Sequence, residues 1–216
     1  AGVDVVAIID SRPDAPKSEF AETFVGAVVS GTGGRLGIGH VDIRLASGGR
    51  KHVQCGALAV SGGWNPNVHL TCHHRGRPAW QDDIAAFVPG EGVPPGMAVA
   101  GAARGVFSTA GTIGDGQAQA IAQLAEIGIT VAADTLPEAE DAPVRVTPLW
   151  HVPGKKRAWL DQQNDVTVKD VKLAHQENFR AVEHLKRYTT LGMAGDQGRT
   201  SNVLGLAVMA ELTGKS

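Results

Sequence analysis

The sequence VDVVAII, residues 3–9, followed by Asp10, sets the architecture of the N-terminal half of the chain. A continuous apolar and β-branched run of strand length is typical of a strand buried on both faces of a parallel sheet. The acid that closes the strand has two interpretations. In dinucleotide-binding folds, a carboxylate at this place accepts hydrogen bonds from a ribose hydroxyl, whereas in other α/β proteins it is only a turn residue.

A glycine fingerprint, G-x-G-x-x-G, accompanies such an acid about 20 residues upstream in these folds. Only nine residues precede Asp10, so we expect the chain to begin inside a Rossmann-like unit. Glycine is abundant, at 28 of 216 residues, and it is clustered between apolar runs. Clustered glycines are typical of folds that bind nucleotides through the backbone.

The composition excludes several classes of protein. Hydrophobic residues make up 43% and charged residues 19% of the chain, which is too apolar for a disordered protein. The net charge of −2 gives no basic field that would favour nucleic acid or a membrane surface. No apolar run has the length of a membrane span, and no export signal is visible. Two cysteines fit a reducing compartment, so we expect a cytoplasmic protein.

The pattern of apolar residues and turns predicts the order of the elements. We expect a helix over residues 18–28, a β-hairpin formed by residues 36–45 and 52–60, a strand over residues 99–104, and a helix over residues 117–127. The second half of the chain predicts a helical segment over residues 168–188, broken around residues 176–178, and a last helix over residues 201–212.

The change in net charge along the sequence predicts two domains. The net charge changes from −5 over residues 1–150, with ten Lys or Arg and fifteen Asp or Glu, to +3 over residues 151–216, with ten and seven. Prolines, glycines and acids over residues 131–158 suit a linker. We therefore predict an incomplete α/β Rossmann-like domain of the two-domain FAD/NAD-binding type over residues 1–150, and a small all-α domain over residues 151–216.

Two glycine turns are candidate nucleotide contacts. Gly62 and Gly63 follow an apolar run, and the turn is either a β-bulge with a crossover or a place where a nucleotide or a neighbouring domain comes close. The predicted strand over residues 99–104 leads through small residues to a helix N-terminus. Backbone N–H groups point outward there and favour phosphate.

Other chemistry is weakly indicated. The motif H-x-x-C-H-H holds four ligand-type side chains, but neighbouring histidines point in different directions and no second pair follows at finger spacing. We predict a solvated turn there and no metal site. Neither a G-x-S-x-G elbow nor a pair of acids suggests hydrolysis. The H-x-x-C-H-H motif consists of His69, Cys72, His73 and His74. Two further histidines, His175 and His184, are expected to be exposed on helices.

Three stretches together resemble a known family. They are DQQNDVTVKDV at residues 161–171, VEHLKRYTTLGM at residues 182–193, and SGGWNP at residues 61–66. They resemble the central part of the α subunit of heterotetrameric sarcosine oxidase. The resemblance implies a share in the oxidative demethylation of sarcosine to glycine, with one-carbon transfer to tetrahydrofolate. It also implies a complex with a β subunit and smaller subunits, in which this segment alone is inactive.

The resemblance also implies where the cofactors lie. NAD belongs to the α subunit, whereas FAD and FMN belong to the β subunit, and no catalytic residue is expected in this segment. Related flavoproteins place Gly-Asp at the turn where this chain has Gly101 and Ala102, so contacts to NAD must come from backbone N–H groups nearby. The resemblance places Gly101, Ala102 and Ala103 at this turn, and nearby backbone adds Phe107 and Thr109 as candidates. Gly62, Gly63 and Asp10, which follow from the sequence pattern above, complete the set of candidate cofactor-binding residues.

The helical domain resembles a bacterioferritin-associated-ferredoxin-like module. Relatives of that module hold a two-iron cluster through four cysteines, and the matching positions here are Asp161, Gln163, Asp196 and Ser201. Because iron–sulfur clusters need thiolates, we expect no iron–sulfur cluster. Two other assignments stay open for the chain as a whole: the α subunit of a related amine or amino-acid dehydrogenase, and a scaffold domain without a cofactor.

The segment KRYTT, residues 186–190, has two interpretations. Lys186 and Arg187 either form a solvated helix end, where cations offset the helix dipole, or contact the FMN phosphate or the β subunit together with Thr189 and Thr190.

Overall fold

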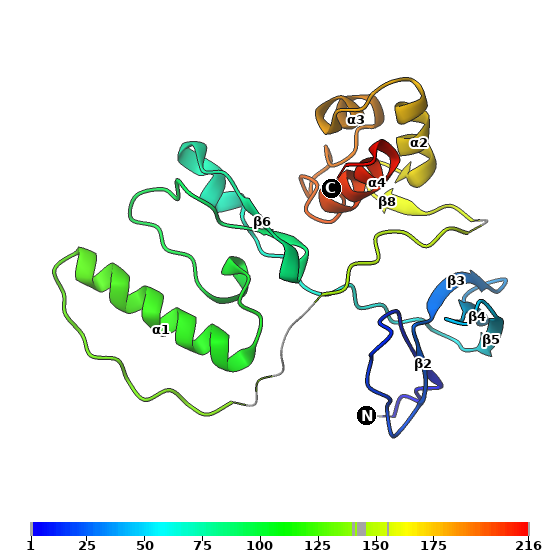
Figure 1. The fold of residues 1–216 in the computed structure, drawn as a ribbon, viewed down its shortest axis with the longest axis horizontal. Helices are drawn as coiled ribbons and strands as arrows, with labels where there is room; N and C mark the ends of the chain where they lie inside the picture. The colour runs from blue at the N-terminus through cyan, green and yellow to red at the C-terminus, as the bar shows by residue number, and fades with distance from the viewer. Residues whose placement is uncertain (1, 140, 142–145, 155, 216) are drawn as a thin grey trace. The chain divides into compact units, whose positions relative to one another are not determined.

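The computed structural model describes residues 2–139, 141, 146–154 and 156–215 (Figure 1). The chain divides into two compact units, one made of Ala1–Val60 with Leu149–Ser216 and the other of Ser61–Pro148. The domain division near residue 151 stays a prediction. No described helix combines the length and the apolar character needed to cross a membrane.

The N-terminal run forms a short parallel pair. β1 (Ala7–Asp10) pairs with β2 (Glu22–Val25), and all four residues of β1 are half-buried. The strand is therefore shorter than residues 3–9, and it is not buried on both faces. The helix predicted over residues 18–28 is wrong. Its Thr-Phe-Val sequence suits a strand, and the pairing with β1, distant in sequence, decides the outcome.

The predicted hairpin is confirmed, but its first strand is shorter than predicted, its second begins two residues earlier, and residues 55–60 lie outside it. β4 (His40–Arg44) and β5 (Arg50–Gln54) pair antiparallel, and β3 (Val28–Gly33) adds to the other edge of β4. Val41 and Ile43 face a small core with Ala27, and they are at most 2% exposed. The opposite face of this sheet is polar.

The second unit contains β6 (Ala79–Gln81), β7 (Ala86–Val88) and the long helix α1 (Thr109–Glu126). The predicted helix is confirmed but begins eight residues earlier. The strand predicted over residues 99–104 is wrong, because Gly101–Arg104 forms the 3-10 turn η3. The Gly101 φ of +61° is incompatible with an extended strand at that residue.

The C-terminal helices are confirmed, including the break between the first two. β8 (Trp159–Asp161) and β9 (Val166–Thr167) lead into α2 (Val168–Gln176), α3 (Val182–Thr189) and α4 (Asn202–Thr213), which gather together in Figure 1. Their shared core includes Val171, Leu185, Leu191, Val208 and Met209, each at most 2% exposed.

The class of the fold is mixed helix and sheet. The described residues form four sheets of two or three strands, and β1 with β2 is the one parallel pair among them. The Rossmann-like arrangement stays a prediction.

Candidate functional site

Asp10 lies at the carboxyl end of β1, where its carboxylate is held by Arg12. It accepts the backbone N–H of Arg12 at 3.0 Å and the guanidinium Nη2 at 2.6 Å. The side-chain hydrogen bond from Arg12 lowers the pKa of Asp10, against the opposing effect of burial. The carboxylate is thus charged and locally engaged, and its role toward a ribose stays a prediction.

Gly62 and Gly63 lie in an exposed segment that is neither helix nor strand. A Cβ built on either glycine meets no atom within 4 Å, so the space around both is open. Gly63 has φ +86°, which explains why glycine suits that position. Both glycines belong to the unit that contains residues 101–109, whereas Asp10 belongs to the other unit, so the structure describes them separately.

The junction between η3 and α1, residues 101–110, is the candidate nucleotide site. Gly101 is buried, and a Cβ there would lie 2.7 Å from Thr112 Cγ2, so a side chain at this position is excluded both by space and by the backbone. Ala102 and Thr109 are exposed, whereas Ala103 and Phe107 are half-buried. The chain therefore presents mainly backbone and small side chains here.

Carboxylates of the chain itself occupy N–H groups at this junction. The Gly101 N–H donates to Asp115 Oδ2 at 2.8 Å, and the Ala110 N–H in the first turn of α1 donates to Asp141 Oδ1 at 3.2 Å. Arg104 forms an ion pair with Asp115 at 2.8 Å. The junction thus binds anionic oxygens, as expected for a helix N-terminus.

The four positions matched to cluster ligands lie at the end of β8 (Asp161), in the turn that follows it (Gln163), and in the segment before α4 (Asp196 and Ser201). Asp161 is 3% exposed and accepts the N–H groups of Gln163, Asn164 and Gly192 at 2.9 to 3.0 Å. Gln163 Oε1 accepts the Asp196 N–H at 3.4 Å.

The fourth position, Ser201, is fully buried. Its hydroxyl has no hydrogen-bond partner among the described residues. Asp196 accepts the hydroxyl of Thr200 and the N–H of Gly198, and these bonds lower the pKa of Asp196. Oxygen atoms thus accept the loop N–H groups around these positions. The absence of a cluster stays a prediction.

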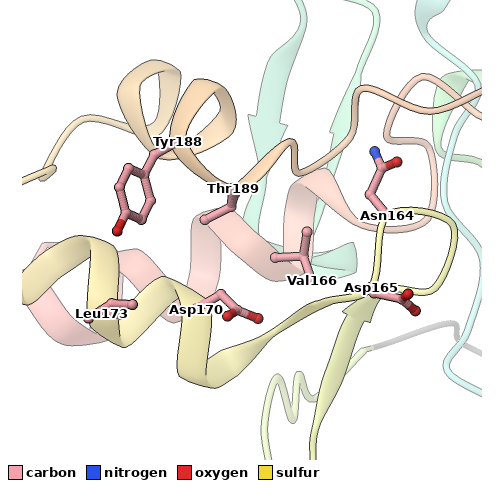
Figure 2. A pocket seen from close by; sticks show the side chains of 7 residues that line it. All are labelled: Asn164, Asp165, Val166, Asp170, Leu173, Tyr188 and Thr189. Atoms are coloured by element: carbon pink, nitrogen blue, oxygen red, sulfur yellow. The ribbon is translucent and has the colours of Figure 1, made fainter.

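A hollow of about 240 Å³ lies beside these loops (Figure 2). Figure 2 shows Tyr188 and Thr189 of α3 on one side and Asp170 and Leu173 of α2 on the other. The Tyr188 pKa is raised, first by a hydrogen bond with Glu177. The lining residues are Asn164, Asp165, Val166, Asp170, Leu173, Tyr188 and Thr189.

The hydroxyls of the KRYTT segment bond locally. Thr189 donates to the Leu185 carbonyl at 2.8 Å, and Thr190 donates to the Thr189 carbonyl at 2.6 Å. Arg187 is exposed and Lys186 is half-buried on α3, and neither lines the hollow. Their contact with a phosphate or a partner subunit stays a prediction.

The H-x-x-C-H-H motif lies in the turn η1 (His69–Arg75), where His73 and His74 have very different backbone angles. Cys72 donates to the Val68 carbonyl at 3.3 Å. A different cluster of possible metal ligands, which was not predicted from the sequence, is made of His40, Asp42 and His52. The alternation H-x-D on a predicted strand, with a histidine on its hairpin partner, is the signal that could have found it.

Comparison with a solved structure defines the class of fold. The L-proline dehydrogenase of P. horikoshii matches 98% of this chain and 45% of its own, with a TM-score of 0.67 and 19% identity. The chain therefore shares the fold of part of a dehydrogenase chain.

Sequence comparisons identify the family to which the chain belongs. The sarcosine oxidase α subunit of Rhizobium meliloti (strain 1021) is 41% identical over 222 residues, and that of Corynebacterium sp. (strain U-96) is 34% identical over 232 residues. The matches cover 100% and 97% of this chain, but only 22% and 24% of those subunits. The Sarcosine oxidase A3 domain family matches residues 155–216. The chain belongs with the sarcosine oxidase α subunits, as a segment of such a subunit.

Proposed function

We propose that this chain is the part of a multi-subunit sarcosine oxidase α subunit that contributes NAD binding and subunit assembly. The observation that carries the proposal is the 41% identity to a sarcosine oxidase α subunit over the whole chain. The parent complex demethylates sarcosine oxidatively to glycine and passes the one-carbon unit to tetrahydrofolate. The amine is oxidised outside this segment, in a complex whose β subunit holds FAD and FMN, and the electrons pass to oxygen.

The junction at residues 101–110 is the proposed place for the NAD pyrophosphate. The exposed Ala110 N–H already donates to a carboxylate, which supports the fit of an anionic oxygen at the first turn of α1. Ala102 and Thr109 leave room at the surface, and Ala103 and Phe107 supply an apolar border. Gly62 and Gly63 belong to the same unit as this junction and are part of the proposed set. Asp10, in the other unit, is proposed separately as an acceptor for a ribose hydroxyl.

The helical part is the proposed assembly surface. Arg187 and Thr190 are exposed at the end of α3 beside Lys186, and this cationic end suits a flavin phosphate or an acidic surface of the β subunit. Reversing the charge at Lys186 in the complex is expected to reduce flavin retention or assembly. Unchanged retention and assembly would refute this part of the proposal.

The NAD proposal is tested by measuring the nucleotide released from the denatured complex. A Gly101 variant is a poor probe, because a side chain there would disturb the buried turn. The exposed Ala102→Trp is expected to fill the nucleotide space and to lower the NAD content at least tenfold, whereas Ala118→Trp, exposed farther along α1, leaves it unchanged. Equal NAD in both variants would refute the site, and no NAD in the unmodified complex would favour a scaffold without a cofactor.

A second candidate is the α subunit of a related amine or amino-acid dehydrogenase. The observation that favours it is the fold shared with the L-proline dehydrogenase chain. The visible spectrum of the purified chain separates the two. We expect a colourless chain that helps a β subunit to retain flavin, whereas iron–sulfur absorption would favour the electron-transferring dehydrogenase.

A further inference from the structure

The polar face of the three-stranded sheet gathers two imidazoles and a carboxylate. His40 and Asp42 are two residues apart on β4, so their side chains share one face. Asp42 is the direct cross-strand partner of His52 on β5. The face is accessible, since the side chains of His52 and Asp42 are 48% and 49% exposed.

The three side chains are close enough to share one ion. His52 Nδ1 lies 3.0 Å from Asp42 Oδ1, and the rings of His40 and His52 have centroids 3.9 Å apart. One potential ligand atom from each of the three residues lies within 4.8 Å of the others. Zinc–nitrogen and zinc–oxygen bonds of about 2.1 Å place tetrahedral ligands about 3.4 Å apart. Small side-chain rotations would bring the ligand atoms, now within 4.8 Å of one another, to this spacing.

The neighbouring strand leaves room for the cluster. Gly33 on β3 pairs with His40, and a Cβ built on Gly33 would overlap the His40 ring. Gly33 does not have a positive φ, so the requirement for glycine there is steric and comes from the imidazole. On the opposite face, the buried Val41 and Ile43 anchor β4, which fixes the direction in which His40 and Asp42 project.

The outer edge of the cluster also has a supporting group. The Gln54 side-chain amide lies 3.1 Å from His52 Nε2, and its oxygen and nitrogen exchange by a flip. With His52 binding an ion through Nδ1, the amide oxygen can accept the Nε2 proton and hold the ring in place.

We propose that His40, Asp42 and His52 form a binding site for one Zn²⁺ ion. Imidazole nitrogens with a single carboxylate suit Zn²⁺, whereas Ca²⁺ and Mg²⁺ favour sites built from oxygen ligands. Three protein ligands on an accessible sheet face leave a fourth coordination position open to water or another small ligand. The site is independent of the NAD proposal and of the H-x-x-C-H-H motif.

The test is a Zn²⁺ titration of the chelator-treated full chain against a chromophoric competitor. We expect one equivalent to bind, with at least tenfold weaker affinity in Asp42→Asn and His52→Gln. Gly33→Ala is expected to weaken binding by displacing the His40 ring while keeping all three ligands. Circular dichroism checks that each variant is folded, and the His40 and His52 NMR signals of the unmodified chain report binding directly.

The matched controls are His74→Gln and Cys72→Ser in the other histidine-rich turn, which are expected to leave the affinity unchanged. Loss of binding in these controls would assign the ion to that turn and overturn the proposal. Binding of less than one equivalent by the unmodified chain, or Zn²⁺ without effect on the His40 and His52 signals, would also overturn it. The cluster would then be an ordinary polar contact between strands.

Discussion

Asp161→Asn is expected to destabilise the helical part of the chain by about 3 kcal/mol. Asp161 Oδ1 accepts the N–H groups of Gln163 and Asn164, and Oδ2 accepts the N–H of the buried Gly192 at 2.9 Å. An asparagine can keep the first two bonds but turns its NH₂ group toward Gly192. Losing a charge-assisted bond costs about 1.5–3 kcal/mol, and an unpaired buried donor costs about 1–3 kcal/mol.

Hydrogen exchange followed by mass spectrometry is the suitable assay, because a chain with two compact units need not unfold in a single step. A loss of about 3 kcal/mol corresponds to about a hundredfold faster exchange in peptides that contain Gly192. Asp165→Asn is the matched control. Asp165 is exposed with φ +55°, a conformation that asparagine adopts readily, so we expect a change within about 0.5 kcal/mol. Equal exchange in the two variants would refute the reasoning.

Three further predictions concern stability. Asp170→Ala removes the carboxylate that accepts the Thr167 N–H and hydroxyl, each at 2.7 Å, and is expected to cost about 1 kcal/mol, measured as faster exchange in α2. Leu191→Ala creates a cavity at a fully buried position and is expected to lower the free energy of unfolding, measured with a chemical denaturant, by about 2–5 kcal/mol. Leu36→Ala, at a fully exposed leucine, is expected to change it very little, and similar losses in the two variants would contradict the core assignment. Because the pKa of Asp10 is lowered in the folded state, its bond with Arg12 stabilises the chain above the unfolded pKa of about 3.9, and this contribution is lost as the pH falls through the lower folded value. Arg12→Met should therefore have a lower Tm at pH 7 than the unmodified chain, and its Tm should fall less between pH 5 and pH 2. A pH dependence of the Tm equal to that of the unmodified chain would refute the role of the ion pair.

Local sequence predicted the helical part well because its signals are local. The segment 168–188 breaks where Asn178 has φ +70°, and asparagine is one of the residues that tolerate this conformation. The wrong predictions fall on segments whose structure depends on residues distant in the sequence. Residues 22–25 form a strand because β1 pairs with them, and residues 99–104 turn because Gly101 lies under Thr112 and donates to Asp115, fourteen residues away.

The candidate sites also differ in whether the sequence could have predicted them. The polar cluster on the sheet could have been predicted, since the hairpin was expected and His40, Asp42 and His52 follow from its alternation and register. The acceptors at the start of α1 could not, because Asp141 is 31 residues from Ala110 and no periodicity connects them. A long-range pairing between one carboxylate and one N–H leaves no pattern in the sequence.

The carboxylates at the junction also determine how an anionic ligand would enter. A buried N–H without an acceptor costs about 1–3 kcal/mol, so the chain supplies an acceptor for Gly101 through Asp115, which is only 15% exposed and paired with Arg104. Asp141 is exposed, and its bond to Ala110 is longer, at 3.2 Å. If a phosphate binds at this junction as proposed, it would displace Asp141 at lower cost than Asp115. Asp141→Ala should accordingly strengthen NAD binding if the pyrophosphate lies at the first turn of α1, and an unchanged affinity would place it elsewhere.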